Sequence, residues 1–222
     1  MGLLTRCRVR GAIPAVLAAV MAAPVLMAAQ TKPQTEQTQP QGQKAQPPAA
    51  QPARIEKFTA TTVNVNPGAG ENLTIRVSRW STDADRDRLA AVLAEKGDAE
   101  LQKTLAAEPT HGYIWTSESL GYSLRYAYRL AMPDGGERII VVTDLRLGTW
   151  TRGNPWKAVQ QQGAPDYPFT MIELRVSRRG VGEGKMSIAT KIAVDQQAKT
   201  LALENYKTAP VLLKDVKHDR TS

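Results

Sequence analysis

The stretch from residue 167 to residue 206 constrains the fold most, because it contains three consecutive strand patterns. They run from Phe169 to Ser177, from Lys185 to Val194 and from Thr200 to Tyr206. Residues 178–184 separate the first two, and three glycines in this segment supply the positive φ angles that a hairpin loop needs. The sequence therefore predicts a β-meander in this part of the chain.

One region changes from the two-residue spacing of strands to the spacing of helices. Thr82 and Asp85 match a capping box, and an apolar stripe follows them at three- and four-residue intervals. Gly97 interrupts this pattern, and glycine commonly ends a helix. We therefore expect two helices, near 83–96 and 99–107, that form a helical hairpin.

Most other apolar segments resemble strands joined by short turns. A first hairpin is predicted from residues 58–65 and 73–80, and further strands from 122–131, 138–143 and 211–216. Turns of this length connect antiparallel strands. The predicted fold class is α+β and predominantly antiparallel β. It is a sandwich or open barrel of about eight or nine strands with one helical hairpin insertion.

The N-terminal segments are predicted to lie outside this domain. Residues 1–29 carry arginines, then an apolar run, then Ala28-Ala29, a pattern typical of a secretory signal peptide. Residues 30–54 are largely Gln, Pro, Thr, Ala and Lys, a composition that predicts a disordered linker. We expect a single β-rich domain over 55–222 in a periplasmic or secreted protein, with no transmembrane span once the leader is removed.

The charge of the chain does not indicate nucleic-acid binding. The formal net charge is +8. Much of this excess lies in the leader and linker, since residues 55–222 hold 23 Lys and Arg against 20 Asp and Glu. Interspersed charges of this kind are the usual arrangement on a domain surface, so no nucleic-acid partner is predicted.

The sequence lacks a recognisable catalytic or cofactor motif. It has no G-x-S-x-G elbow, and its only histidines, His111 and His218, stand far apart without metal-ligand spacing. We interpret His111 as a solvated loop residue and His218 as part of a charged terminal tail. No cofactor and no metal is predicted, and a non-catalytic role is favoured.

The connection over residues 147–168 is the predicted contact surface. It combines aromatic and hydrogen-bonding side chains in a long, otherwise polar loop, which suits a glycan, another cell-envelope component or a protein partner. The alternative is that its tryptophans fold back as a lid over one end of the β core. The candidate binding residues are Trp150, Arg152, Asn154, Trp156 and Tyr167.

A glycoside hydrolase is an alternative function, because Glu173 and Glu204 both lie in the predicted meander. The competing interpretation is an ion-pair ladder on a solvated sheet face. If Ile192 opposes Leu203, then Lys191 lies opposite Glu204. The face of Glu173 is shared by Arg175, Lys185 and Lys191. The ladder is favoured over catalysis.

A lipocalin-like carrier is the third alternative. It requires a hollow barrel, lined in this chain by Tyr126, Tyr128 and Ile188. The alternation over residues 122–131 places Leu124, Tyr126, Tyr128 and Leu130 on one face.

Several runs of residues carry a resemblance to a known family. They are Arg79–Asp87, Leu120–Tyr122 with Leu124–Ala127, Asp166–Thr170 followed by Ile172–Leu174, Gly182–Lys185 and Leu203–Tyr206. Through these runs, and over nearly all of the domain from Leu73 onward, the chain resembles a family of uncharacterised exported bacterial proteins. The resemblance implies a bacterial, exported, single-domain protein. It implies no activity, cofactor or catalytic residue.

Overall fold

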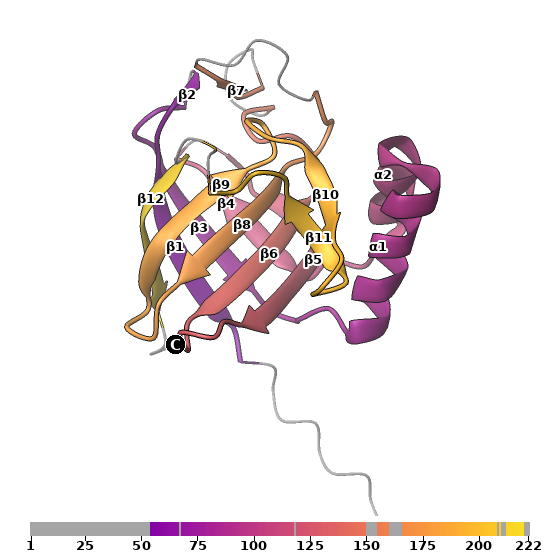
Figure 1. The fold of residues 1–222 in the computed structure, drawn as a ribbon. Helices are drawn as coiled ribbons and strands as arrows, with labels where there is room; N and C mark the ends of the chain where they lie inside the picture. Colours follow the sequence, from indigo (N-terminus) through magenta and orange to yellow (C-terminus); the bar gives the residue numbers. More distant parts are fainter. Residues whose placement is uncertain are drawn as a thin grey trace, which may run out of the picture. The chain divides into compact units, whose positions relative to one another are not determined.

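Antiparallel strands dominate the structure, a computed structural model that describes residues 54–66, 68–117, 119–149, 155–159, 166–207, 209 and 212–219 (Figure 1). The predicted signal peptide and nearly all of the predicted linker lie outside these residues. The strands are β1 (Glu56–Thr62), β2 (Val65–Asn66), β3 (Asn72–Val77), β4 (Gly112–Trp115), β5 (Tyr122–Ala131), β6 (Glu137–Thr143), β7 (Lys157–Ala158), β8 (Met171–Val176), β9 (Val181–Met186), β10 (Ile192–Asp195), β11 (Thr200–Leu203) and β12 (Leu213–Asp219).

Eight of these strands form a closed barrel in the order β1-β12-β9-β8-β6-β5-β4-β3. The barrel closes because β1 pairs with β12 on one side and with β3 on the other, both antiparallel. The predicted antiparallel β class is therefore confirmed. The sheet forms a closed barrel, whereas the prediction was a sandwich or an open barrel. Closure depends on pairing between the first and last strands, which no local pattern reports.

The two predicted helices are confirmed, as α1 (Asp83–Lys96) and α2 (Asp98–Ala107). Thr82 and Asp85 form the predicted capping box, with reciprocal side-chain to backbone bonds of 3.2 and 2.9 Å. Gly97 separates the helices at a positive φ of 78°. Among the described residues, neither helix is long and apolar enough to cross a membrane.

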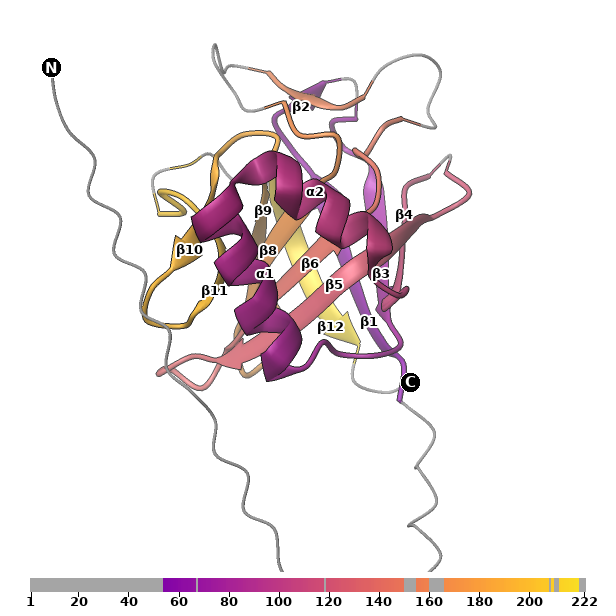
Figure 2. The ribbon, with the colours of Figure 1, turned by 90° about the vertical axis from the view of Figure 1, so that its right-hand side faces the viewer.

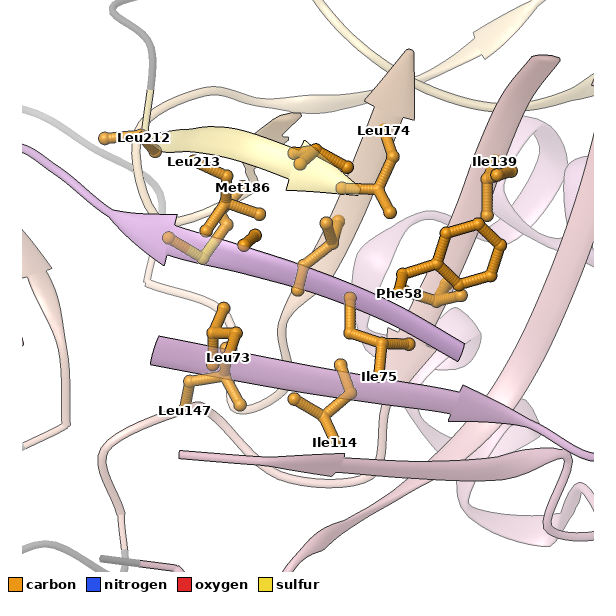
Figure 3. Packing of buried hydrophobic residues seen from close by; sticks show 14 of the residues in the cluster. Phe58, Leu73, Ile75, Ile114, Ile139, Leu147, Leu174, Met186, Leu212 and Leu213 are labelled. Atoms are coloured by element: carbon orange, nitrogen blue, oxygen red, sulfur yellow. The ribbon is translucent and has the colours of Figure 1, made fainter. Parts of the chain in front are cut away.

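The barrel interior is filled by apolar side chains, the inner cluster, which Figure 3 shows from close by. Alternate residues of each strand point inward, so that Phe58 of β1, Ile75 of β3, Ile114 of β4 and Leu174 of β8 meet in it, all fully buried. A packed interior holds a barrel together mainly through buried apolar area. The interior therefore resembles a core and not a binding cavity.

A bulge in β5 changes which residues face this interior. The pairing of β5 with β6 shifts register between Leu124 and Tyr126. Leu124 consequently points inward, whereas Tyr126 and Tyr128 belong to a second cluster outside the barrel. The prediction that these three side chains share one face is wrong, because a bulge reverses the alternation that follows it. Of the residues predicted to line a carrier cavity, only Ile188 packs in the inner cluster.

The second cluster, here called the outer cluster, lies between the barrel and the elements that cover it. Leu89, Leu101 and Leu105 of the helices and Ile192 of β10 pack on residues of β5, β6 and β8. In Figure 2 the two helices lie in front of β5 and β6. One side of the barrel is thus covered by α1, α2 and the β10–β11 hairpin.

The predicted three-stranded meander is only partly correct. β8 and β9 are neighbours in the barrel, but β10 and β11 form a separate two-stranded sheet. The predicted strand from 185 to 194 is therefore divided between β9 and β10. The glycines expected in a loop lie partly within β9, where a Cβ at Gly182 would overlap the carbonyl oxygen of Arg175. The predicted register of the second hairpin is confirmed, since Ile192 opposes Leu203.

Candidate functional site

An open cleft of about 430 Å³ lies where the β10–β11 hairpin and the turn after β11 meet the outer surface of the barrel. Strands β6 and β8 contribute its arginines, because alternate residues of these strands point outward there. The hairpin and the turn contribute the remaining side chains. The cleft is lined by Arg138, Arg175, Ala193, Asp195, Ala202, Leu203, Glu204, Asn205, Tyr206 and Lys207.

Glu173 lies beneath this cleft and is fully buried. Arg175 reaches its Oε1 through Nε and Nη2, at 3.1 and 2.9 Å. Arg138 contacts Oε1 through Nε at 2.9 Å and donates from Nη2 to Oε2 at 3.1 Å. The backbone N–H of Leu203 also donates to Oε2, at 3.2 Å. Four of these contacts are hydrogen bonds, whereas the Nε of Arg138 makes an ion pair without hydrogen-bond geometry. A carboxylate has about four lone-pair sites, so Glu173 has no acceptor site left for a substrate or a water molecule.

Glu173 therefore has a structural role. It joins β6, β8 and β11 and attaches the second hairpin to the barrel. The predicted pairing with Arg175 is confirmed, but the predicted solvated sheet face is wrong for Glu173, because the β10–β11 hairpin covers it. Glu204 is exposed on the rim of the cleft, and its backbone N–H donates to the carbonyl of Lys191 at 2.8 Å.

Ionised groups of both signs surround Glu173. Arg138 also pairs with Asp195, at 2.7 Å. Partial burial raises the pKa of Asp195, but hydrogen bonds from Ala198 and the Arg138 guanidinium outweigh this and lower it overall. Lys185, which is 3 % exposed, lies opposite Glu173 on β9 and donates to the carbonyl of Ala209. Arg138, Arg175 and Lys185 thus accompany Glu173 and Asp195, and Glu183 of β9 stands opposite Arg175.

Tyr206 closes the cleft on the side of the turn. The Arg175 guanidinium lies over its ring at 3.7 Å from the centroid, and the Lys185 ammonium lies 5.0 Å from it. The side chain is 7 % exposed, and its hydroxyl has no hydrogen-bond partner among the residues that the structure describes. Burial raises the pKa of Tyr206, so the hydroxyl stays protonated and can donate at neutral pH.

The residues predicted to bind a ligand are not brought together at this cleft. Trp156 is fully buried in the inner cluster, and Tyr167 is 7 % exposed in the outer cluster, with its hydroxyl accepting from the backbone N–H of Ile192 at 3.2 Å. Neither side chain is exposed, and for Trp156 the alternative prediction, a ring folded back over one end of the β core, is confirmed. Trp150, Arg152 and Asn154 lie outside the described residues, so their contact role stays a prediction.

His111 and Ser81 lie close together, but their geometry argues against a nucleophile and its base. The Nδ1 atom of His111 is 3.1 Å from the carbonyl oxygen of Arg79 and 3.5 Å from Oγ of Ser81. A carbonyl only accepts, so Nδ1 carries the proton and cannot deprotonate Ser81. Ser81 Oγ instead accepts the backbone N–H of Ala127 at 3.2 Å.

The predicted solvation of both histidines is also wrong. His111 is 3 % exposed, and its backbone carbonyl and N–H are bonded to Ser78 and Leu124 next to β4. The His218 ring stacks on Phe58 at 4.3 Å, and its Nε2 lies 3.1 Å from Glu56. The tail expected around His218 is in fact the end of β12, which pairs with β1.

We expect His111 to make stability depend on pH. Burial lowers the pKa of His111 below 6.5, although its bond to Arg79 acts in the opposite direction. The unfolded chain then binds the proton first, so stability is fully present above about pH 6.5 and falls below it, by about 1.4 kcal/mol per pH unit at most. Urea unfolding at several pH values should show this slope, and His111→Gln should reduce it. Equal slopes in the two proteins would contradict the assignment.

The geometry of the cleft would have been hard to predict. The alternation over residues 171–176 does place Glu173 and Arg175 on one face, and this signal was available. The turn of residues 204–207 brings Tyr206 over Arg175, and turn conformations of this kind carry no periodic signal.

The chain was also compared with known proteins. A scan against protein-family models, a search of curated proteins and a search of solved structures each found no match.

Proposed function

We propose that this chain is an exported, non-catalytic binding module that holds an acidic, hydroxyl-bearing ligand, such as a cell-wall glycan fragment, in the cleft beside Tyr206. The observation that carries the proposal is the buried Tyr206 hydroxyl without a partner among the described residues. An unsatisfied buried hydroxyl costs about 1–3 kcal/mol. The hydroxyl is covered in the free protein, so in this proposal the exposed turn of residues 204–207 shifts when a ligand binds, and the ligand acceptor then removes this cost. Export is supported by the leader-like pattern of residues 1–29.

The charges at the cleft support an acidic ligand. Arg175 uses Nε and Nη2 to bind Glu173, which leaves the N–H groups of Nη1 for a ligand carboxylate. Lys207 lies on the same cleft. Asp195, Glu204 and Asn205 add acceptors and an amide at the rim, which suit the hydroxyl groups of a sugar.

A non-catalytic role is favoured over hydrolysis because Glu173 is saturated by N–H groups. A glycoside hydrolase needs one carboxylic acid and one carboxylate that both reach the substrate. Glu204 reaches the cleft, whereas Glu173 lies beneath it and bonds to two arginines. A carrier function is not favoured, because the barrel is packed with side chains.

Tyr206→Phe is expected to weaken binding while stabilising the free protein. Loss of one hydrogen bond should reduce affinity about 5- to 10-fold. Removal of an unpaired buried hydroxyl should raise the free energy of unfolding by about 1 kcal/mol. Isothermal titration with a disaccharide that contains N-acetylmuramic acid, with chitobiose as the neutral comparison, would measure the first effect, and urea unfolding the second.

Tyr126→Phe is the matched control. Tyr126 is also buried in the outer cluster, but its hydroxyl lies 3.2 Å from that of Thr200. Its loss should therefore lower stability by about 1 kcal/mol and leave affinity unchanged. If neither sugar binds, or if Tyr206→Phe binds the acidic sugar as well as the wild type does, the proposed function is wrong.

A further inference from the structure

One side of the barrel is left uncovered by the helices and the second hairpin. The barrel residues of the outer cluster come from β5, β6 and β8, at Tyr126, Tyr128, Ile140, Val142 and Met171. The outward side chains of β12, β1, β3 and β4 face solvent instead, and we call this surface the open face. In Figure 1, β12, β1 and β3 lie on the side of the barrel opposite α1 and α2.

The register of these four strands arranges the open face in rows. In one row Lys57 of β1, Arg76 of β3 and Tyr113 of β4 are consecutive partners. The next row runs from Lys217 of β12 through Thr59 and Thr74 to Trp115. Each row therefore ends in an aromatic residue on β4. Both rows begin on β12, the first at Asp219 opposite Lys57, and at the usual strand spacing each row spans about 14 Å.

The β12 side of the open face carries two exposed lysines. Lys214 and Lys217 are exposed on β12, and neither has an ion-pair partner among the described residues. Lys57 lies 4.0 Å from Asp219, which is a weak pair between half-exposed groups. β12 itself carries two lysines and two aspartates, Asp215 and Asp219, so the excess of cations on the open face comes from Lys57 of β1 and Arg76 of β3.

The β4 side of the open face is aromatic. Tyr113 is 45 % exposed, and its ring lies 5.7 Å from that of Trp115 in a tilted arrangement. The Arg76 guanidinium lies 5.5 Å from the Trp115 ring. A half-exposed aromatic ring beside a guanidinium can stack on a sugar ring and at the same time bind an acidic substituent.

We propose that the open face binds an anionic polysaccharide, with its chain lying along the rows from β12 to β4. The lysines of β12 would bind the acidic groups, and Tyr113 would stack on a sugar ring. Between them lie the threonine hydroxyls of Thr59 and Thr74, which can hydrogen-bond to sugar hydroxyls. A lipid surface fits this face less well, because threonines and not aliphatic side chains occupy its middle.

The test compares two double variants that change the net charge equally. Lys214→Glu with Lys217→Glu alters the open face, and Lys96→Glu with Lys103→Glu alters the exposed side of the helices. Binding to polygalacturonate at low salt, measured by affinity electrophoresis, should weaken at least 10-fold in the first variant and less than 2-fold in the second. Circular dichroism would show that both variants remain folded.

Tyr113→Ala adds a test that does not depend on charge. Loss of stacking should weaken binding about 3- to 10-fold at every salt concentration. Equal weakening by the two charge variants would overturn the proposal, as would unchanged binding in Tyr113→Ala. Binding to anionic phospholipid vesicles without binding to polygalacturonate would also overturn it. If Tyr206→Phe weakens binding to polygalacturonate as much as Tyr113→Ala does, the polysaccharide binds at the cleft and the proposal for the open face is wrong.

Discussion

Replacing Glu173 with alanine should lower the free energy of unfolding by about 3–5 kcal/mol, because it leaves two partly buried guanidinium groups without their shared carboxylate. The Leu203 N–H also loses its acceptor. Arg138 retains Asp195 at 2.7 Å, so the larger loss falls on Arg175 and on the hairpin that Glu173 attaches. Urea unfolding would measure the total change. Hydrogen exchange at the amides of β11 would show whether the hairpin separates from the barrel first.

Glu204→Ala is the matched control for this prediction. It removes the same charge from the same region, but Glu204 is exposed, so stability should change by less than about 0.5 kcal/mol. Glu173→Gln should fall between the two variants, since an amide oxygen can still accept from Leu203. A loss below about 1 kcal/mol for Glu173→Ala would mean that the two arginines find other partners, and the structural role of Glu173 would be wrong.

Replacing Trp156 with alanine should cost about 3–5 kcal/mol through the cavity that it leaves at one end of the barrel. The indole is fully buried and lies against Gly68 and Gly148, where any Cβ would overlap it. Its backbone N–H donates to Leu147 at 2.9 Å, and its carbonyl accepts from Arg146 at 3.0 Å. Trp156 therefore closes this end of the barrel.

Trp156→Phe should lose less stability than Trp156→Ala, because a smaller ring still fills part of the space. Trp115→Ala provides a comparison on the outer surface of the barrel, where the expected loss is about 1 kcal/mol. Unfolding followed by far-ultraviolet circular dichroism avoids the change in tryptophan emission. If the two alanine variants lose equal stability, Trp156 does not fill the barrel end in the way described.

Local sequence patterns predicted the helices and strands well where apolar residues kept one spacing, that of a helix or that of a strand, along the whole segment. The helices begin and end within a residue of their expected bounds, because Thr82 and Gly97 carry specific capping chemistry. The second hairpin has its predicted register for a similar reason, since apolar residues alternate without interruption in β10 and β11. Antiparallel pairing followed from the short turns.

The sequence-based predictions were wrong in two situations. In one, a single extra residue reversed the inward and outward alternation of a strand; in the other, the environment of a side chain depends on a segment far away in the sequence. The extra residue at the β5 bulge turned Tyr126 and Tyr128 outward. The burial of Glu173 depends on the second hairpin lying over β8, and a charged residue in a strand is equally consistent with a solvated face. Trp156 was expected in a polar loop, but it fills the barrel end because glycines at positions 68 and 148 leave room for its ring.

The seam between β1 and β12 has a consequence for how the chain reaches its native state. β1 pairs with β12, for example at Lys57 and Asp219. The barrel therefore cannot close until β12 has been synthesised and has paired with β1. Pairings between such distant segments form slowly, because a long loop of chain must be ordered before they contribute free energy. Before β12 pairs, the edges of β1 and β9 have unpaired backbone groups that can pair with strands of other chains. A chaperone that binds the unfolded chain would protect these edges.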